Sequence, residues 1–131
     1  MAMDKLKLLI VDDEEGIVDM IKRTYLEKGF VTFGATDGIK AVEIYEKERP
    51  EIALIDIHMP FSPIDGIETL KRIKNIDKNA ICLMVTRIDQ KDKIKAAKDL
   101  GALHYIPKPF TMSELDGAVN EAADIIKKGK K

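Results

Sequence analysis

The sequence has almost no cysteine, no long apolar run and no excess of charge of one sign. Of its 131 residues only Cys82 is a cysteine, so no disulfide can form within the chain. The apolar runs have the length of strands, far below the roughly 20 residues of a membrane span. With no secretory leader at the start, we expect a cytoplasmic protein that binds no membrane. The net charge of −1 gives no reason to expect direct nucleic-acid binding.

The composition is that of a folded globular protein. Hydrophobic residues make up 45% of the chain and charged residues 34%, a balance that is unlike that of disordered chains. The length suits one domain of ordinary size. We therefore predict a single domain over residues 1–131, with an ordered core over roughly residues 5–128.

Short apolar blocks alternate with amphipathic ones along the whole chain. Five blocks are partly β-branched and predict strands: Leu6–Val11, Phe30–Ala35, Ile52–Ile55, Ala80–Val85 and Leu103–Ile106. Several lack polar alternation, which indicates burial on both faces. The intervening segments have helical patterns, and the order βαβαβαβαβα predicts a five-stranded parallel sheet of the α/β class, covered by helices on both faces.

Three of the predicted helices show clear apolar stripes. Their members are Ile17, Met20, Ile21 and Tyr25; Ile67, Leu70 and Ile73; and Leu115, Ala118, Val119, Ala122 and Ile126. Thr111 stands three residues before Glu114, the spacing of a capping box at the start of the last helix. Gly29 and Gly101 follow helical patterns, where a left-handed residue ends a helix.

Chemically active side chains stand at the carboxyl ends of four predicted strands. They are Asp12 and Asp13 after the first strand, Asp56 after the third, Thr86 after the fourth and Lys108 near the end of the fifth. The carboxyl ends of parallel strands meet at one edge of the sheet, where ligands of such folds bind. We therefore expect these side chains to converge.

Three converging carboxylates need either raised pKa values or a cation between them. Oxygen ligands favour a hard ion, and Mg²⁺ or Mn²⁺ would suit them. A metal site flanked by Lys108 and Thr86 has the cations and donors that phosphoryl transfer requires. A carboxylate can itself attack phosphorus and form an aspartyl phosphate.

Each residue also has a simpler interpretation. Asp12 and Asp13 could cap the helix that follows, and Asp56 could be an ordinary acid in a loop near a helix. Thr86 could be an unremarkable residue at a strand end, and Lys108 a solvated lysine. Their joint placement on alternating strand ends favours the functional interpretation.

Four segments in this order resemble the receiver domains of two-component response regulators. They are LLIVDDEEG at 8–16, LIDIHMP at 54–60, MVT at 84–86 and YIPKPF at 105–110. The resemblance implies a flavodoxin-like sheet with strand order 2-1-3-4-5 and Asp56 as the phosphoacceptor. It also implies that Asp13, Asp56 and the backbone carbonyl of His58 ligate Mg²⁺, with Asp12 acting through a water molecule.

The same resemblance implies roles for further residues and for partners. Thr86 would hydrogen-bond the phosphoryl group, Lys108 would pair with it, and the Lys108–Pro109 peptide would be cis. Tyr105 resembles the switch aromatic that turns inward as Thr86 moves. The donor would be a sensor histidine kinase or a histidine phosphotransfer protein, and an unknown output protein would bind the face of the fourth helix, fifth strand and fifth helix.

By the same resemblance the chain is a signalling module and not an enzyme, apart from self-catalysed phosphotransfer and autodephosphorylation. We expect a monomer or a weak dimer.

Three features depart from the usual pattern of that family. Phe61-Ser62-Pro63-Ile64 separates Met59-Pro60 from Asp65-Gly66, two residues more than usual, so Phe61 could shield the site or contact a partner. Arg87 stands where a small residue is usual, and could obstruct entry or bind phosphate. His58 lies beside the path of attacking water and could tune hydrolysis. Arg87 and the longer loop predict slow loss of the phosphoryl group.

The sequence fits two other functions and an inactive form of the domain less well. A phosphatase of the haloacid dehalogenase type would place its nucleophile in a D-x-D motif after the first strand, whereas Asp56-Ile57-His58 lacks the second acid. A flavodoxin-like cofactor binder would need a phosphate-binding loop after the first strand, where this chain has carboxylates. A degenerate receiver would lack some of the five principal residues, all of which are present.

Overall fold

Five strands alternate with five helices in the computed structural model, which describes residues 5–87 and 91–129. The elements are β1 (Lys7–Val11), α1 (Glu15–Glu27), β2 (Val31–Ala35), α2 (Gly38–Glu48), β3 (Ile52–Asp56), α3 (Gly66–Ile76), β4 (Ile81–Arg87), α4 (Lys91–Asp99), β5 (His104–Lys108) and α5 (Met112–Gly129). Residues 1–4 and 130–131, which the predicted domain includes, lie outside the described residues. No helix in the described ranges combines the length and the apolarity needed to cross a bilayer.

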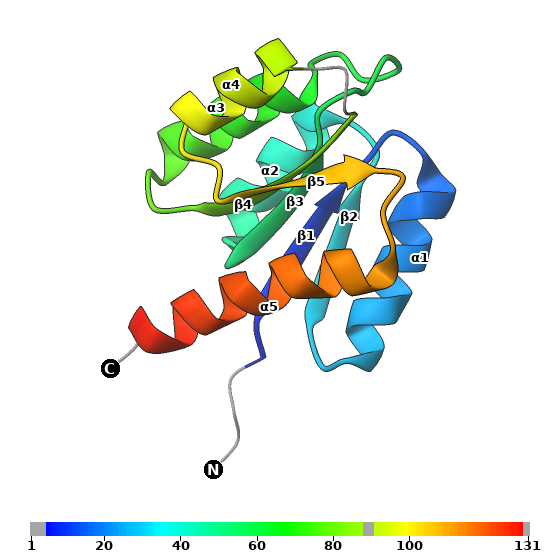
Figure 1. Cartoon of the computed structure of the whole chain (residues 1–131), viewed down its shortest axis with the longest axis vertical. Coiled ribbons are helices and arrows are strands. Elements are labelled where there is room, and N and C mark those ends of the chain that lie inside the picture. Colours follow the sequence, from blue (N-terminus) through cyan, green and yellow to red (C-terminus); the bar gives the residue numbers. More distant parts are fainter. Residues whose placement is uncertain (1–4, 88–90, 130–131) are drawn as a thin grey trace.

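The strands form one parallel sheet in the order β2-β1-β3-β4-β5, which confirms the predicted α/β fold. Figure 1 shows α1 and α5 on one face of this sheet and α2, α3 and α4 on the other. In a parallel sheet of this kind, the carboxyl ends of all strands lie at the same edge. That edge carries the residues that the sequence singled out.

Alternate residues along the strands pack into two separate hydrophobic cores. Leu9 and Val11 of β1 point into the core beneath α2, α3 and α4, whereas Leu8 and Ile10 point into the core beneath α1 and α5. All five residues of β3 are buried, as expected for a central strand covered on both faces. The central strand, which ends in Asp56, is thus held from both sides.

The predicted helix signals are mostly confirmed. The Thr111 hydroxyl accepts from the Glu114 amide at 3.1 Å, and Glu114 accepts from the Thr111 amide at 2.8 Å, which completes the capping box of α5. Gly29 and Gly101 have positive φ values of 99° and 91°. Met20 was wrongly placed on the buried face of α1, because it is 43% exposed. The buried stripe runs through Val18, Ile21 and Tyr25, and Met20 is turned about 100° from Ile21.

The strands at the functional edge extend further than predicted. The fourth strand was expected to end at Val85 and the fifth at Ile106, but β4 reaches Arg87 and β5 reaches Lys108. Backbone pairing places Thr86 beside Pro107 and Arg87 beside Lys108. The apolar pattern stops early because Thr86, Arg87 and Lys108 have polar side chains, although the backbone of these residues continues the sheet.

Candidate functional site

Three carboxylates meet at the carboxyl edge of the sheet. Asp12 directly follows β1, Asp13 comes next, and Asp56 is the last residue of β3. One oxygen of each lies within 4.8 Å of the others. The structure therefore brings together acids that are more than 40 positions apart in the sequence.

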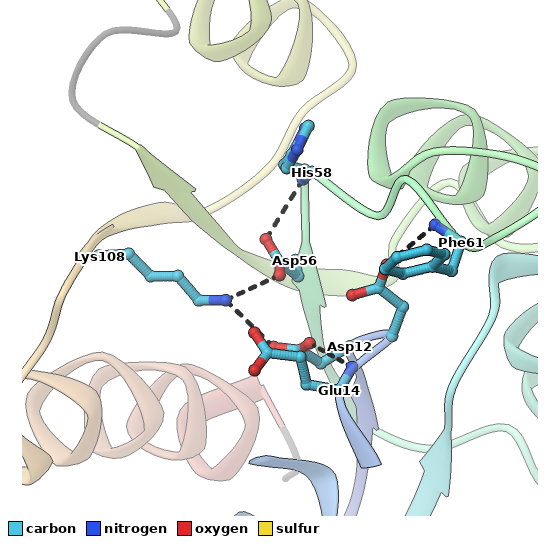
Figure 2. Close-up of polar contacts among 7 residues, drawn as sticks. Asp12, Glu14, Asp56, His58, Phe61 and Lys108 are labelled. Atoms are coloured by element: carbon cyan, nitrogen blue, oxygen red, sulfur yellow. Dashed lines mark hydrogen bonds and ion pairs between the residues drawn. The ribbon is translucent and has the colours of Figure 1, made fainter. Parts of the chain in front are cut away.

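The Lys108 ammonium joins two of these acids. It lies 2.9 Å from Asp56 Oδ2 and 3.3 Å from Asp12 Oδ2, reaching across from the end of β5 (Figure 2). Burial lowers the pKa of Lys108, but the hydrogen bond from Lys108 to Asp56 and the charges of both acids outweigh burial and raise that pKa. The lysine thus stays charged, and its interpretation as a solvated side chain is wrong.

Asp56 is a buried carboxyl group with only 4% of its surface exposed. Burial and, to a smaller extent, the charge of Asp12 raise its pKa from 3.8 to about 6, against the opposing effect of Lys108. The His58 backbone amide donates to Asp56 Oδ1 at 3.2 Å. The carboxyl group is therefore held at both oxygens, one by an amide and one by an ammonium.

Asp12 and Asp13 are each bound by a loop amide. The Glu14 amide donates to Asp12 Oδ1 at 2.9 Å, and the Phe61 amide donates to Asp13 Oδ2 at 3.1 Å. Glu14, not an aspartate, stands at the N-cap of α1, and its side chain makes no cap hydrogen bond. The interpretation of Asp12 and Asp13 as helix caps is therefore wrong, as is that of Asp56 as a loop acid.

The donor set fits a hard divalent cation. Three carboxylates face one ammonium, so an excess of negative charge remains at the edge of the sheet. All the acidic ligands offer oxygen, the atom that Mg²⁺ and Mn²⁺ prefer. The excess negative charge of this cluster could be balanced by a cation, which could in turn hold an anionic group.

Thr86 and Tyr105 lie on the neighbouring strands. The buried Thr86 hydroxyl donates to the Arg87 carbonyl at 3.2 Å. The half-buried Tyr105 packs against the core beneath α2, α3 and α4, and its hydroxyl donates to the Ala102 carbonyl at 3.5 Å. Beyond β5 the Lys108–Pro109 peptide is cis. Neither described hydroxyl bond is to an acid of the cluster, so Thr86 would have to turn in order to bind a group on Asp56.

The three residues that depart from the family pattern border an open cleft over Asp56. The cleft has a volume of about 300 Å³, and its lining includes His58, Phe61 and Arg87 together with Asp56 and Lys108. Phe61 and Arg87 are both exposed. The structure thus places the long loop and Arg87 at the entrance to the acid cluster.

Two contacts of the loop between β3 and α3 were not foreseen. A Cβ atom on Gly66 would lie 2.2 Å from the Asp56 carbonyl oxygen, so α3 begins directly against the backbone of the central acid. Ser62 accepts from the Gly38 amide at 2.8 Å and thereby ties the loop to α2. The Asp-Gly pair at residues 65–66 was a signal for the close approach of Gly66 to Asp56. Nothing in the sequence indicated the hydrogen bond between Gly38 and Ser62.

Comparison with known proteins gives one consistent result. Residues 8–120 match the response regulator receiver domain family. The chain is 41% identical over 115 residues to sporulation initiation phosphotransferase F of Bacillus subtilis, covering 88% of this chain and 91% of that protein. It is 35% identical over 115 residues to the chemotaxis protein CheY of Halobacterium salinarum, covering 88% and 94%.

A solved structure gives the same result at the level of the fold. The CheY-like receiver domain protein of Methanospirillum hungatei superposes with a TM-score of 0.89 at 26% identity, over 96% of this chain and 99% of that one.

Proposed function

The chain belongs to the response regulator receiver domain family, which serves phosphorelay signalling, and from that membership we propose that Asp56 is its phosphoacceptor. One observation carries this proposal. Asp56 is the buried acid at the end of the central strand, it contacts Lys108 at 2.9 Å, and it lies beside two further carboxylates. The donor would be a sensor histidine kinase or a histidine phosphotransfer protein.

The acid cluster would hold Mg²⁺ or Mn²⁺. Asp13, Asp56 and the backbone carbonyl of His58 would be direct ligands, and Asp12 would act through a water molecule. When bound, such an ion supplies positive charge to the oxygens of the transferred group. The protein contributes the placement of the acids, through the amides of Glu14 and Phe61 that fix Asp12 and Asp13.

The transfer reaction exchanges one bond to phosphorus for another. A carboxylate oxygen of Asp56 forms a bond to phosphorus while the bond from phosphorus to the donor's imidazole nitrogen breaks. The electron pair of that bond returns to the imidazole, which then takes a proton from water. Lys108 already lies within hydrogen-bond distance of Asp56, so it is placed to neutralise charge on the phosphoryl oxygens.

A phosphoryl group on Asp56 would change the charge and the hydrogen bonds of the edge. It adds about −1.5 to −2 charges and three acceptor oxygens. The Thr86 hydroxyl would leave the Arg87 carbonyl and donate to the phosphoryl group, with Tyr105 following inward. The face formed by α4, β5 and α5 would then bind an output protein.

Residues 1–131 would form a single receiver domain in the cytoplasm, either alone or as part of a longer regulator. The domain would be a monomer or a weak dimer without direct contact to nucleic acid. Its own chemistry would be limited to self-catalysed phosphotransfer and autodephosphorylation.

The proposal is tested by the intact mass of the protein after incubation with phosphoramidate and Mg²⁺. We expect a single phosphoryl adduct on the native chain and none on Asp56→Asn. Asp124→Asn, which changes an exposed acid on α5, should be labelled like the native chain. No adduct on the native chain, or an adduct that survives in Asp56→Asn, would refute the assignment of Asp56.

A further inference from the structure

Phe61 is the most exposed large hydrophobic side chain in the described ranges. It is 89% exposed, against 43% to 61% for Met20, Leu26 and Ile125. It stands in the loop between β3 and α3, at the point where this chain has two residues more than the family pattern. An aromatic ring in water loses the free energy that burial would give it, so its position calls for a physical reason.

The backbone beneath the ring is fixed by several contacts. The Phe61 amide donates to Asp13 at 3.1 Å, and the Ser62 amide donates to the Met59 carbonyl at 3.1 Å. The Ser62 hydroxyl donates to the Ile64 carbonyl at 2.6 Å and accepts from the Gly38 amide at 2.8 Å. Prolines on both sides, at 60 and 63, restrict the loop further. The ring is therefore presented on a constrained loop.

The ring lies at the entrance to the acid cluster. Phe61 lines the same cleft as Asp56, and Asp56 itself is only 4% exposed. A donor group must therefore enter the cleft to reach this carboxylate. A protein that carries the group on a histidine side chain has to lay its own surface over the rim, and Phe61 is part of that rim.

We propose that Phe61 is an anchor for the phosphodonor protein, inserted into an apolar recess beside the phosphorylated histidine of that protein. This proposal rests on the proposed function of Asp56. Aromatic side chains are enriched in protein interfaces, and a loop whose backbone is already fixed loses less freedom on binding than a mobile one. The charged residues around the cleft, among them Glu14, Arg87 and Lys108, do not form the broad apolar face that a lipid surface would need.

The experiment compares a small donor with protein donors. The small donor is phosphoramidate. The protein donors are the histidine kinases encoded in the same genome, each first autophosphorylated with radiolabelled ATP, and the histidine phosphotransfer proteins that these kinases phosphorylate. The variants are Phe61→Ala, the conservative Phe61→Tyr, and Leu26→Ala as a matched control, which truncates another exposed apolar side chain at the far end of α1.

For the protein donor that transfers fastest, we expect kcat/KM to fall roughly ten- to a hundredfold in Phe61→Ala. The loss should lie in KM, and Phe61→Tyr should restore most of it. Leu26→Ala should transfer like the native chain. Labelling by phosphoramidate and the lifetime of the acyl phosphate should be the same in all four proteins, because the ring takes no part in the chemistry.

Several outcomes would overturn the anchor. The anchor role of Phe61 would be refuted if the protein donor transferred equally well to Phe61→Ala and to the native chain. It would also be refuted if kcat/KM fell equally in Leu26→Ala. A shorter acyl-phosphate lifetime in Phe61→Ala would make the ring a shield against water instead. If phosphoramidate labels Asp56 but neither a kinase nor a phosphotransfer protein transfers to the native chain, the anchor is wrong while the acceptor stands. Failure of phosphoramidate itself would refute the acceptor.

Discussion

Replacing Asp56, the proposed phosphoacceptor, by Asn should stabilise the fold. Burial raises the pKa of Asp56 from 3.8 to about 6, so the folded state disfavours the carboxylate relative to water. At neutral pH the native protein nevertheless carries that charge. An amide of nearly the same shape avoids the cost.

The magnitude follows from the pKa. A rise from 3.8 to about 6 corresponds to about 3 kcal/mol at neutral pH. The pKa of about 6 already includes the pairing of Asp56 with Lys108 at 2.9 Å, which lowers that pKa, so the loss of this ion pair is not subtracted again. We therefore expect Asp56→Asn to raise the free energy of unfolding by roughly 2–3 kcal/mol at pH 7.5.

The pH dependence gives the sharper test. Because the folded pKa lies above the unfolded one, the native state binds more protons between about pH 4 and pH 6. The native protein therefore loses stability as the pH rises through that window, and the full cost is present above about pH 6. The advantage of Asp56→Asn should be largest at pH 7.5 and vanish near pH 4.

The assay is urea unfolding of both proteins in EDTA, which keeps divalent ions from binding to the native acids. Asp124→Asn serves as the control for loss of one exposed acid. Two results would show that burial does not raise the pKa of Asp56. One is an Asp56→Asn variant no more stable than the native protein at pH 7.5, and the other is a stability difference that does not change with pH.

Three further predictions concern other parts of the fold. Gly66→Ala should cost about 2–3 kcal/mol in urea unfolding, since its Cβ would lie 2.2 Å from the Asp56 carbonyl oxygen, whereas Gly117→Ala, with no atom within 4 Å, should be neutral or stabilising. Burial raises the pKa of Cys82 to about 12, so the native thiol should react with Ellman's reagent at pH 8 far more slowly than the unfolded one. Arg87→Ala should shorten the acyl-phosphate lifetime if Arg87 obstructs water, and an unchanged lifetime would remove Arg87 from that role.

The sequence predicted the sheet and the acid cluster because both follow from local patterns. Buried strands such as Ile52–Asp56 have unbroken apolar runs, and parallel strands must place their final residues along one edge. The convergence of Asp12, Asp13, Asp56 and Lys108 thus needed only the order of the elements. The strand order 2-1-3-4-5 was predicted from the resemblance to receiver domains, not from the apolar patterns of the sequence.

Other features could not be read from the sequence because they depend on packing. The sequence did not mark the apolar face of α4, where Ala97 alone is buried, because lysines dominate its nine residues. The hydrogen bond from Tyr25 to Asp116 joins residues 91 positions apart, and neither has a neighbour that predicts the other. The exposure of Met20 likewise depends on how α1 is rotated against the sheet.

The loop between β3 and α3 is closed at its base. The Gly66 amide donates to the Ile57 carbonyl at 3.0 Å, so the two ends of the loop are joined beside Asp56 whatever lies between them. Lengthening a closed loop costs only a slowly growing amount of chain entropy. Residues 59–65 carry Phe61 between these closed ends. We therefore expect that exchanging this segment between related chains would change which kinase phosphorylates the protein, while Asp56 keeps its position.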